Sequence, residues 1–151
     1  MNKARFIRQC PASDPLVWQA WFDGSATPNP GRLGLGVLLR DPTGGTRGFS
    51  QAAGYGDSTV AEYLALILSL EQALLSQATR LMVYGDSQIV IQDVLGVVPV
   101  RRGDCVEYRC HVRTLMAQFA EISLKWIPRA KNTDADKLSH DAFVQNISNN
   151  V

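Results

Sequence analysis

Four acidic residues stand at the predicted ends of secondary-structure elements. They are Asp23 at the end of the first strand, Glu62 in the first turn of a long helix, Asp86 at the end of the fourth strand and Asp136 at the start of the last helix. Convergent carboxylates without Cys or His partners are the ligands that hard divalent cations such as Mg²⁺ prefer. Two such cations about 4 Å apart activate a water and stabilise a leaving oxygen in an attack on phosphorus.

Each of these carboxylates also has a purely structural explanation. Asp23 before Gly24 is typical of a turn. The segment 59–62 matches a capping box, in which Glu62 would only cap a helix. Asp86 and Asp136 would be favourable charges at helix N-termini. Spacing alone therefore leaves both explanations open at every position.

The elements that must position these residues follow from the hydrophobic pattern. Residues 17–23 alternate between two faces, as a strand does, and residues 24–31 are rich in turn formers. Residues 33–40 and 46–53 predict two further strands, joined by a tight turn over 41–45. Three strands with short connections predict an antiparallel meander.

The second half of the chain alternates helices and strands. A long helix is predicted over residues 60–78, with Ser58 or Thr59 as its N-cap. It is followed by a strand (80–84), a short helix (86–95), another helix (104–119), a strand (122–127) and a last helix (132–145). Helical crossovers join parallel strands, so the pattern predicts one α/β domain with a mixed sheet. The carboxyl ends of neighbouring parallel strands lie side by side, which would bring Asp23 and Asp86 together.

Length and composition fit a single globular domain. The chain has 151 residues, of which 46% are hydrophobic and 19% charged, and its net charge of +1 neither supports nor excludes nucleic acid. We assign residues 1–16 to an N-terminal extension, 17–145 to the domain and 146–151 to a flexible tail. The longest apolar segment, 64–75, is interrupted by polar residues, and the N-terminus has no apolar signal segment. The sequence therefore predicts a soluble, cytoplasmic protein without membrane contact.

Several other patterns are interpreted as structural. The three cysteines, odd in number and without a C-x-x-C pair, predict neither a disulfide framework nor a zinc site. The alternating glycines of segment 31–36 are not followed by a helix, so they indicate close backbone packing rather than a dinucleotide loop. His140 lies one turn after Asp136, near enough to influence the site, but is interpreted as a solvated or packing residue. Arg109 and Arg113 are interpreted as a solvated helix face.

The sequence around the four carboxylates resembles the type 1 ribonuclease H family (ribonuclease HI) from Trp21 to Ala142. The matching motifs are FDGS (22–25) followed by NPG (29–31), AEYxAL (61–66), YGDSQ (84–88) and WIPRxxNxxADxL (126–138). Four motifs that agree in order favour the metal site over the structural explanations. The resemblance implies a ribonuclease H-like five-stranded mixed sheet flanked by helices. It also implies hydrolysis of the RNA strand of RNA–DNA hybrids, with 5′-phosphate and 3′-hydroxyl ends.

The resemblance further implies roles for individual residues. The four matched carboxylates would be the catalytic, metal-binding residues, with Mg²⁺, or alternatively Mn²⁺, as the cofactor. Six residues would bind the substrate: Gly24, Ser25, Asn29, Ser58, Thr59 and Gln88. The polar side chains among them would contact the minor groove, where only RNA offers 2′-hydroxyls. The expected partner is an RNA–DNA hybrid, and we expect a monomer with no protein partner.

The chain departs from the family pattern in two places. Many bacterial members place a His in the loop before the last helix, whereas this loop holds Arg129 and Lys131 and resembles the branch with a W-I-P-R loop. Some bacterial members also carry a basic protrusion that grips the hybrid. Here residues 97–104 supply only Arg101 and Arg102, so we expect weaker substrate binding.

Two alternative functions on the same fold are weighed against the hybrid-cleaving enzyme. A non-catalytic module that binds RNA–DNA hybrids would keep the fold without turnover, and the intact acidic positions argue against it. A nuclease for double-stranded RNA, or a DNA-joining enzyme, is disfavoured by the D-G-S and G-D-S-Q motifs. Cleavage assays on the three kinds of duplex separate these functions.

Overall fold

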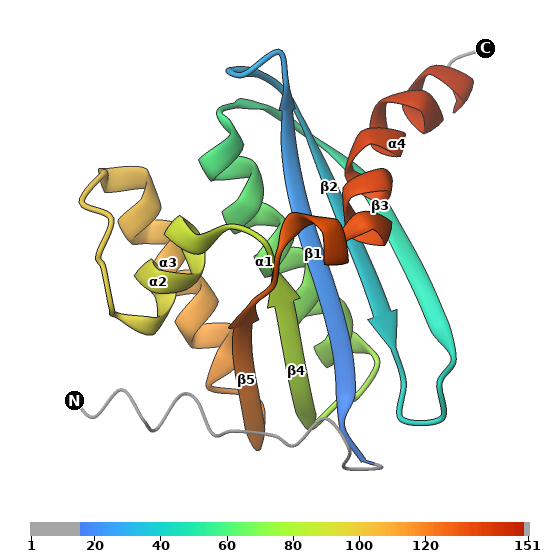
Figure 1. The fold of residues 1–151 in the computed structure, drawn as a ribbon, viewed down its shortest axis with the longest axis vertical. Coiled ribbons are helices and arrows are strands. Elements are labelled where there is room, and N and C mark those ends of the chain that lie inside the picture. The colour runs from blue at the N-terminus through green and yellow to red at the C-terminus, as the bar shows by residue number, and fades with distance from the viewer. Residues whose placement is uncertain (1–15, 150–151) are drawn as a thin grey trace.

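The computed structural model describes residues 16–149, which form five strands and four α-helices (Figure 1). The sheet has the order β3-β2-β1-β4-β5. β1 (Trp18–Thr27), β2 (Gly31–Arg40) and β3 (Thr46–Gly56) pair antiparallel, while β4 (Arg80–Gly85) and β5 (Glu121–Trp126) continue the sheet in parallel from β1. This arrangement confirms the predicted mixed sheet. Residues 1–15, including Cys10, and residues 150–151 lie outside the described part of the chain.

Helices cover both faces of the sheet. They are α1 (Ser58–Leu75), α2 (Gln88–Leu95), α3 (Gly103–Met116) and α4 (Thr133–Asn149), with a short 3₁₀ helix, η2 (Arg129–Lys131), before α4. α1 packs on β1 and β2, α3 packs against α1, and α4 crosses the opposite face over β1, β2 and β3 (Figure 1). The predicted helices all occur, with ends displaced by a few residues. α4 continues to Asn149 rather than ending at residue 145.

The main hydrophobic core lies between α1 and the sheet. Phe22 of β1, Leu81 of β4 and Leu66 of α1 are fully buried there. By length and composition alone α1 is apolar enough to cross a membrane, yet 61% of its residues are buried inside the domain. Burial of large apolar side chains is the dominant favourable contribution to folding. The apolar character of α1 is thus accounted for by its place as the central core helix.

Strand β1 is longer than predicted. The pattern ended the strand at Asp23 and placed a turn from residue 24, yet pairing with β2 continues through Gly24 to Thr27. The parallel pairing of β1 with β4 ends beside Asp23, and its last pair is Phe22 with Gly85. Asp23 therefore lies inside a rigid antiparallel pair, at the point where β4 leaves the sheet.

The N-terminus of α1 also differs from the prediction. The N-cap is Asp57, rather than Ser58 or Thr59, and its side chain accepts a hydrogen bond of 3.0 Å from the backbone N of Val60. Glu62 consequently lies in the second turn of the helix and not in the first. A capping box needs its glutamate three residues after the cap, so the capping explanation of Glu62 is wrong.

Two glycines of β2 let α4 lie directly on the sheet. A Cβ added to Gly34 would lie 2.1 Å from the carbonyl oxygen of Ser139, and one added to Gly36 would lie 2.2 Å from that of Ala135. Real side chains do not approach backbone this closely, so any larger residue would push α4 away. This confirms that the alternating glycines serve close packing, and they set how deeply α4 reaches toward Asp23.

Candidate metal centre

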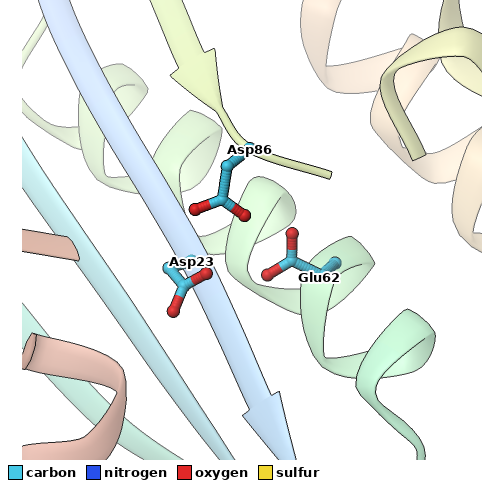
Figure 2. A group of neighbouring side chains, drawn as sticks. All are labelled: Asp23, Glu62 and Asp86. Atoms are coloured by element: carbon cyan, nitrogen blue, oxygen red, sulfur yellow. The ribbon is translucent and has the colours of Figure 1, made fainter. Parts of the chain in front are cut away.

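Three carboxylates from three separate elements meet beside the end of β4 (Figure 2). Asp23 comes from the middle of β1, Glu62 from α1 and Asp86 from the residue directly after β4. One oxygen from each lies within 4.8 Å of the others. The predicted meeting of Asp23 and Asp86 is therefore confirmed, and Glu62 joins them as the resemblance implied.

The fourth predicted ligand, Asp136, lies at the rim. It lines the same cavity of about 350 Å³ as the three carboxylates, but it is not one of the group whose oxygens come together. Its Oδ1 is 3.4 Å from Nε2 of His140 and 3.8 Å from Nη2 of Arg129. His140 is exposed, in agreement with its interpretation as a solvated residue, and it contacts Asp136 one turn away, near enough to influence the site as expected.

Two members of the carboxylate cluster are buried, and the third, Asp86, is partly buried. Asp23 is 7% exposed and Glu62 6%. Burial, followed by the charge of Asp86, raises the pKa of Asp23 to about 6. Burial and the charge of Asp23 raise the pKa of Glu62 well above its usual range. Both shifts reflect the cost of placing like charges together in a medium less polar than water. Among the described residues, no Lys or Arg forms an ion pair with any of the three.

Glu62 is held at one oxygen and open at the other. Its Oε1 accepts a hydrogen bond of 2.5 Å from the backbone N of Gly24. The approach is close because Gly24 has no side chain: an added Cβ would lie 2.2 Å from the backbone of Ala61. Oε2 of Glu62 is buried without a hydrogen-bond partner among the described residues. A buried acceptor of this kind is costly unless a ligand satisfies it.

Asp86 is oriented by Asn132, a fully buried residue just before α4. Its Nδ2 donates to Oδ2 of Asp86 at 3.0 Å and to the backbone oxygen of Phe22 at 2.9 Å. Asn132 thereby links the loop after β4 to β1. The sequence places Asn132 in a matched motif, but nothing in the residue pattern shows that its side chain reaches a carboxylate 46 residues away.

These donors fit a hard divalent cation. All three ligands are oxygen atoms, their mutual repulsion is uncompensated by protein cations, and one buried oxygen has no partner. A divalent cation would satisfy that oxygen and offset the repulsion at once. Cys and His, which softer metals favour, are absent from the group of three.

The chain matches the family model described as reverse transcriptase-like over residues 21–142. The solved structure of RNase H1 from the halophilic archaeon Halobacterium salinarum superposes with a TM-score of 0.82. Its sequence identity is 32%, covering 85% of this chain and 98% of that one. This chain belongs to the ribonuclease H1 family.

Two further family members show the extent of the likeness. LC11-RNase H1, solved in complex with an RNA/DNA hybrid, matches with a TM-score of 0.78 and 29% identity over 86% of this chain and 99% of that one. The bifunctional protein Rv2228c of Mycobacterium tuberculosis is 35% identical over 123 residues, which are 80% of this chain and 34% of that protein. This chain thus spans about a third of the length of the first curated relatives that it matches.

The substrate contacts expected for a ribonuclease H1 family member fall into two groups. Those that line the cavity beside the carboxylates are Gly24, Ser25, Asn29 and Ser58. Asn29 and Ser58 bind each other: Nδ2 of Asn29 donates to the hydroxyl of Ser58 at 3.1 Å, and the backbone N of Ser58 donates to Oδ1 of Asn29 at 3.1 Å. Thr59 and Gln88 do not line this cavity, and Gln88 is exposed at the start of α2.

The connection between α2 and α3 contains two arginines, Arg101 and Arg102. The charge of Arg102 is offset by two neighbouring carboxylates. Arg102 pairs with Asp57, the N-cap of α1, at 2.6 Å and with Asp104 at 2.7 Å. These carboxylates offset the charge that a family member with a basic protrusion would present to a hybrid. Weaker substrate binding stays a prediction, to which these ion pairs add a physical argument.

Two arginines of α3 do not form the solvated face that the sequence suggested. Arg109 forms a 2.7 Å ion pair with Asp93, which is fully buried. Arg113 donates to the backbone oxygen of Val94 at 3.0 Å, at the end of α2. That interpretation is wrong because both side chains reach across to α2, a contact that helical spacing alone does not reveal. In the same helix, Cys105 is buried and Cys110 exposed.

Proposed function

We propose that this chain is a divalent-metal-dependent endonuclease that hydrolyses the RNA strand of RNA–DNA hybrids and leaves 5′-phosphate and 3′-hydroxyl ends. The observation that carries the proposal is the cluster of Asp23, Glu62 and Asp86, buried in large part and not neutralised by any described Lys or Arg. Membership of the ribonuclease H1 family, with a relative solved on an RNA/DNA hybrid, supports this choice of substrate.

Mg²⁺ is the proposed cofactor, with Mn²⁺ as the alternative. The ligands would be Asp23, Glu62 and Asp86, with Asp136 completing the set from the rim of the same cavity. Once bound, such a cation supplies an activated water and stabilises the charge that develops on the reacting phosphate. Oxygen ligands and the buried, unpartnered Oε2 of Glu62 favour a hard ion over zinc or copper.

The chain's own residues contribute by holding the ligands before the substrate arrives. The backbone of Gly24 fixes Glu62, and the amide of Asn132 fixes Asp86 against β1. Loss of a partner that orients a metal ligand in this way typically costs about 10- to 100-fold in metal affinity or activity. At the rim, Arg129 and His140 place positive or proton-donating groups next to Asp136, where an incoming phosphate would pass.

Selectivity for RNA would come from the polar wall of the cavity. Asn29 is oriented by its two hydrogen bonds with Ser58, while its second amide hydrogen is left to donate to the substrate. The 2′-hydroxyl of RNA accepts such a hydrogen bond, and DNA has no equivalent group. The same wall therefore distinguishes the strand to be cut from its DNA partner.

The test is cleavage of a labelled RNA–DNA hybrid, an RNA duplex and a DNA duplex of one sequence, each with Mg²⁺ and with excess EDTA. We expect cleavage of the hybrid's RNA strand only, dependent on Mg²⁺, with 5′-phosphate on the products. Hybrid binding without cleavage would instead support the non-catalytic module. Full activity in EDTA, or 2′,3′-cyclic ends, would overturn the metal mechanism, because cyclic ends mean that the RNA 2′-hydroxyl attacked.

A further inference from the structure

A buried serine of α4 contacts the carboxylate cluster from the face of the sheet opposite to α1 (Figure 1). Ser139 has no exposed surface, and its Oγ lies 2.9 Å from Oδ2 of Asp23. The same Oγ lies 2.8 Å from the backbone oxygen of Asp136, three residues earlier in the helix. The residues assigned from the sequence motifs do not include Ser139.

The hydroxyl of Ser139 has one proton and two acceptors within reach. A charged acceptor forms the stronger hydrogen bond, so the proton is directed to Asp23 whenever that carboxylate is ionised. Oδ2 of Asp23 is then occupied by the serine. In Figure 2, one oxygen of Asp23 points toward Glu62 and Asp86 and the other points away from them. A hydrogen bond to one oxygen fixes the rotation of the carboxylate, and with it the direction of the second oxygen.

The packing of α4 makes this contact possible. Gly34 and Gly36 of β2 allow the backbone of α4 to touch the sheet at Ser139 and Ala135. From β3, the hydroxyl of Ser50 donates to the backbone oxygen of Leu138 at 2.5 Å. Two strands therefore hold α4 at the depth at which a short side chain such as serine reaches Asp23.

We propose that Ser139 is a positioning residue: its hydroxyl fixes the Asp23 carboxylate for cation binding and ties α4, which carries Asp136, to the metal site. The proposal rests on the proposed function, because it concerns how that cation is bound. Ser139 itself is buried and does not line the cavity, so it acts through Asp23 and does not touch the substrate.

The competing explanation is that Ser139 only satisfies a backbone oxygen within its helix. Ser69 of α1 provides a matched control for that role. It is also fully buried, and its hydroxyl donates to the backbone oxygen of Leu66, three residues earlier, at 2.6 Å. In the described part of the chain, the hydroxyl of Ser69 forms no hydrogen bond with a carboxylate. Ser69→Ala thus removes the helical hydrogen bond without removing a partner of a ligand.

The experiment compares four proteins: the parent, Ser139→Ala, Ser139→Cys and Ser69→Ala. For each, the thermal midpoint is measured without substrate as a function of Mg²⁺ concentration, and the kinetics of hybrid cleavage are measured separately. Removing a partner of a metal ligand weakens metal binding by about 10-fold or more. We therefore expect Ser139→Ala to need at least about 10-fold more Mg²⁺ for half-maximal stabilisation. Its kcat at low Mg²⁺ should fall, excess Mg²⁺ should restore it, and KM for the hybrid should not change.

Ser139→Cys replaces the hydroxyl with a slightly larger thiol, which still donates but more weakly, so its Mg²⁺ requirement should lie between those of the parent and Ser139→Ala. It also carries the test if the alanine variant does not fold. Ser69→Ala should match the parent in Mg²⁺ requirement, whatever its stability. If Mg²⁺ stabilises the parent and both Ser139 variants have the same Mg²⁺ requirement as the parent, the positioning role is wrong but the metal site is not. If the parent itself neither binds Mg²⁺ nor cleaves, the proposed function is wrong as well.

Discussion

Among the residues whose burial the structure describes, carboxylates are buried in two regions, and the surroundings of these regions are opposite. Asp93 of α2 is fully buried and accepts hydrogen bonds from the hydroxyl of Tyr63 in α1 and the backbone N of Val100. It also pairs with Arg109 of α3 at 2.7 Å. Asp23 and Glu62 are about as well enclosed, yet the charge beside them is another carboxylate. One region balances its charge within the protein, and the other does not.

The difference separates a structural role from a functional one. A buried charge that is fully paired holds its neighbours in one arrangement, here the end of α2 and the start of its connection to α3. A buried cluster of like charges destabilises the protein that carries it, so it persists where binding needs it. On this basis Asp93 belongs to the scaffold, and the cluster belongs to a cation site.

The largest expected effect is on cleavage by the Asp86→Asn variant. The amide keeps the shape of the side chain but deletes one negative charge, so cleavage should fall by at least about 100-fold, more than is typical when only a partner of a ligand is lost. In EDTA the variant should be as stable as the parent or more stable, because repulsion of Asp23 is relieved. The measurements are hybrid cleavage and a denaturant unfolding curve.

The matched change in the other region is Asp93→Asn. It also deletes one negative charge, here a fully buried one, but it leaves Arg109 without its partner. This variant should therefore lose stability and keep Mg²⁺-dependent cleavage below its melting temperature. If Asp93→Asn is neutral and Asp86→Asn is destabilising in EDTA, the assignment of the two regions is reversed.

Arg109→Ala should have the next largest effect. It leaves Asp93 buried and uncompensated, which typically costs about 3–5 kcal/mol of unfolding free energy. Arg102→Ala is the control, because its ion pairs lie at the exposed surface and are screened by solvent, so its cost should be much smaller. Equal losses in urea unfolding for the two variants would show that burial of the Asp93 pair is not what matters.

A smaller effect concerns pH. The pKa of Asp23 in the folded protein is about 6, above the usual 3.8, so the folded state binds this proton more tightly than the unfolded state. The stability that this proton contributes is present below about pH 4 and is lost as the pH rises through about 6. In EDTA, the unfolding free energy of Asp23→Asn relative to that of the parent should therefore increase by roughly 2–3 kcal/mol between pH 4 and 7. A stability difference that does not vary with pH would contradict the raised pKa.

The smallest expected effect is that of Gln88→Ala. Gln88 is exposed and lies outside the cavity, so the variant should fold normally and cleave the hybrid only moderately more slowly. Asn29→Ala should be slower, because Asn29 lines the cavity beside the carboxylates. Unaltered cleavage by Gln88→Ala would show that Gln88 does not contact the substrate. A larger loss than that of Asn29→Ala would indicate that the substrate lies closer to α2.

Sequence reasoning succeeded where local pattern decides the structure. Alternation, turn formers and helical periodicity predict the order of all five strands and four helices, and the motifs identify the three carboxylates that meet. Strand and helix ends were less accurate. The turn formers from residue 24 onward predict a strand end at Asp23, but the pairing of β1 with β2 continues to Thr27. Only the pairing of β1 with β4 ends beside Asp23.

Contacts between distant elements were beyond the reach of sequence patterns. Helical spacing places Ser139 on the same side of α4 as Asp136, but its contact with Asp23 depends on the depth of α4 over Gly34 and Gly36. Arg109 likewise has the spacing of a surface residue, and only the packing of α3 against α2 brings it to Asp93. Such contacts depend on how the helices pack against the sheet and against one another, which the order of residues does not reveal.

In the proposed function, Asp23, Glu62 and Asp86 together bind a catalytic divalent cation. The most direct measurement is the thermal midpoint of the parent and of Asp86→Asn, each in EDTA and in saturating Mg²⁺. A ligand stabilises the folded state only as far as it binds there, so Mg²⁺ should raise the midpoint of the parent and raise that of the variant much less. Equal shifts for both proteins, with Asp86→Asn less stable in EDTA, would show that Asp86 is a structural residue and that the metal site is wrong.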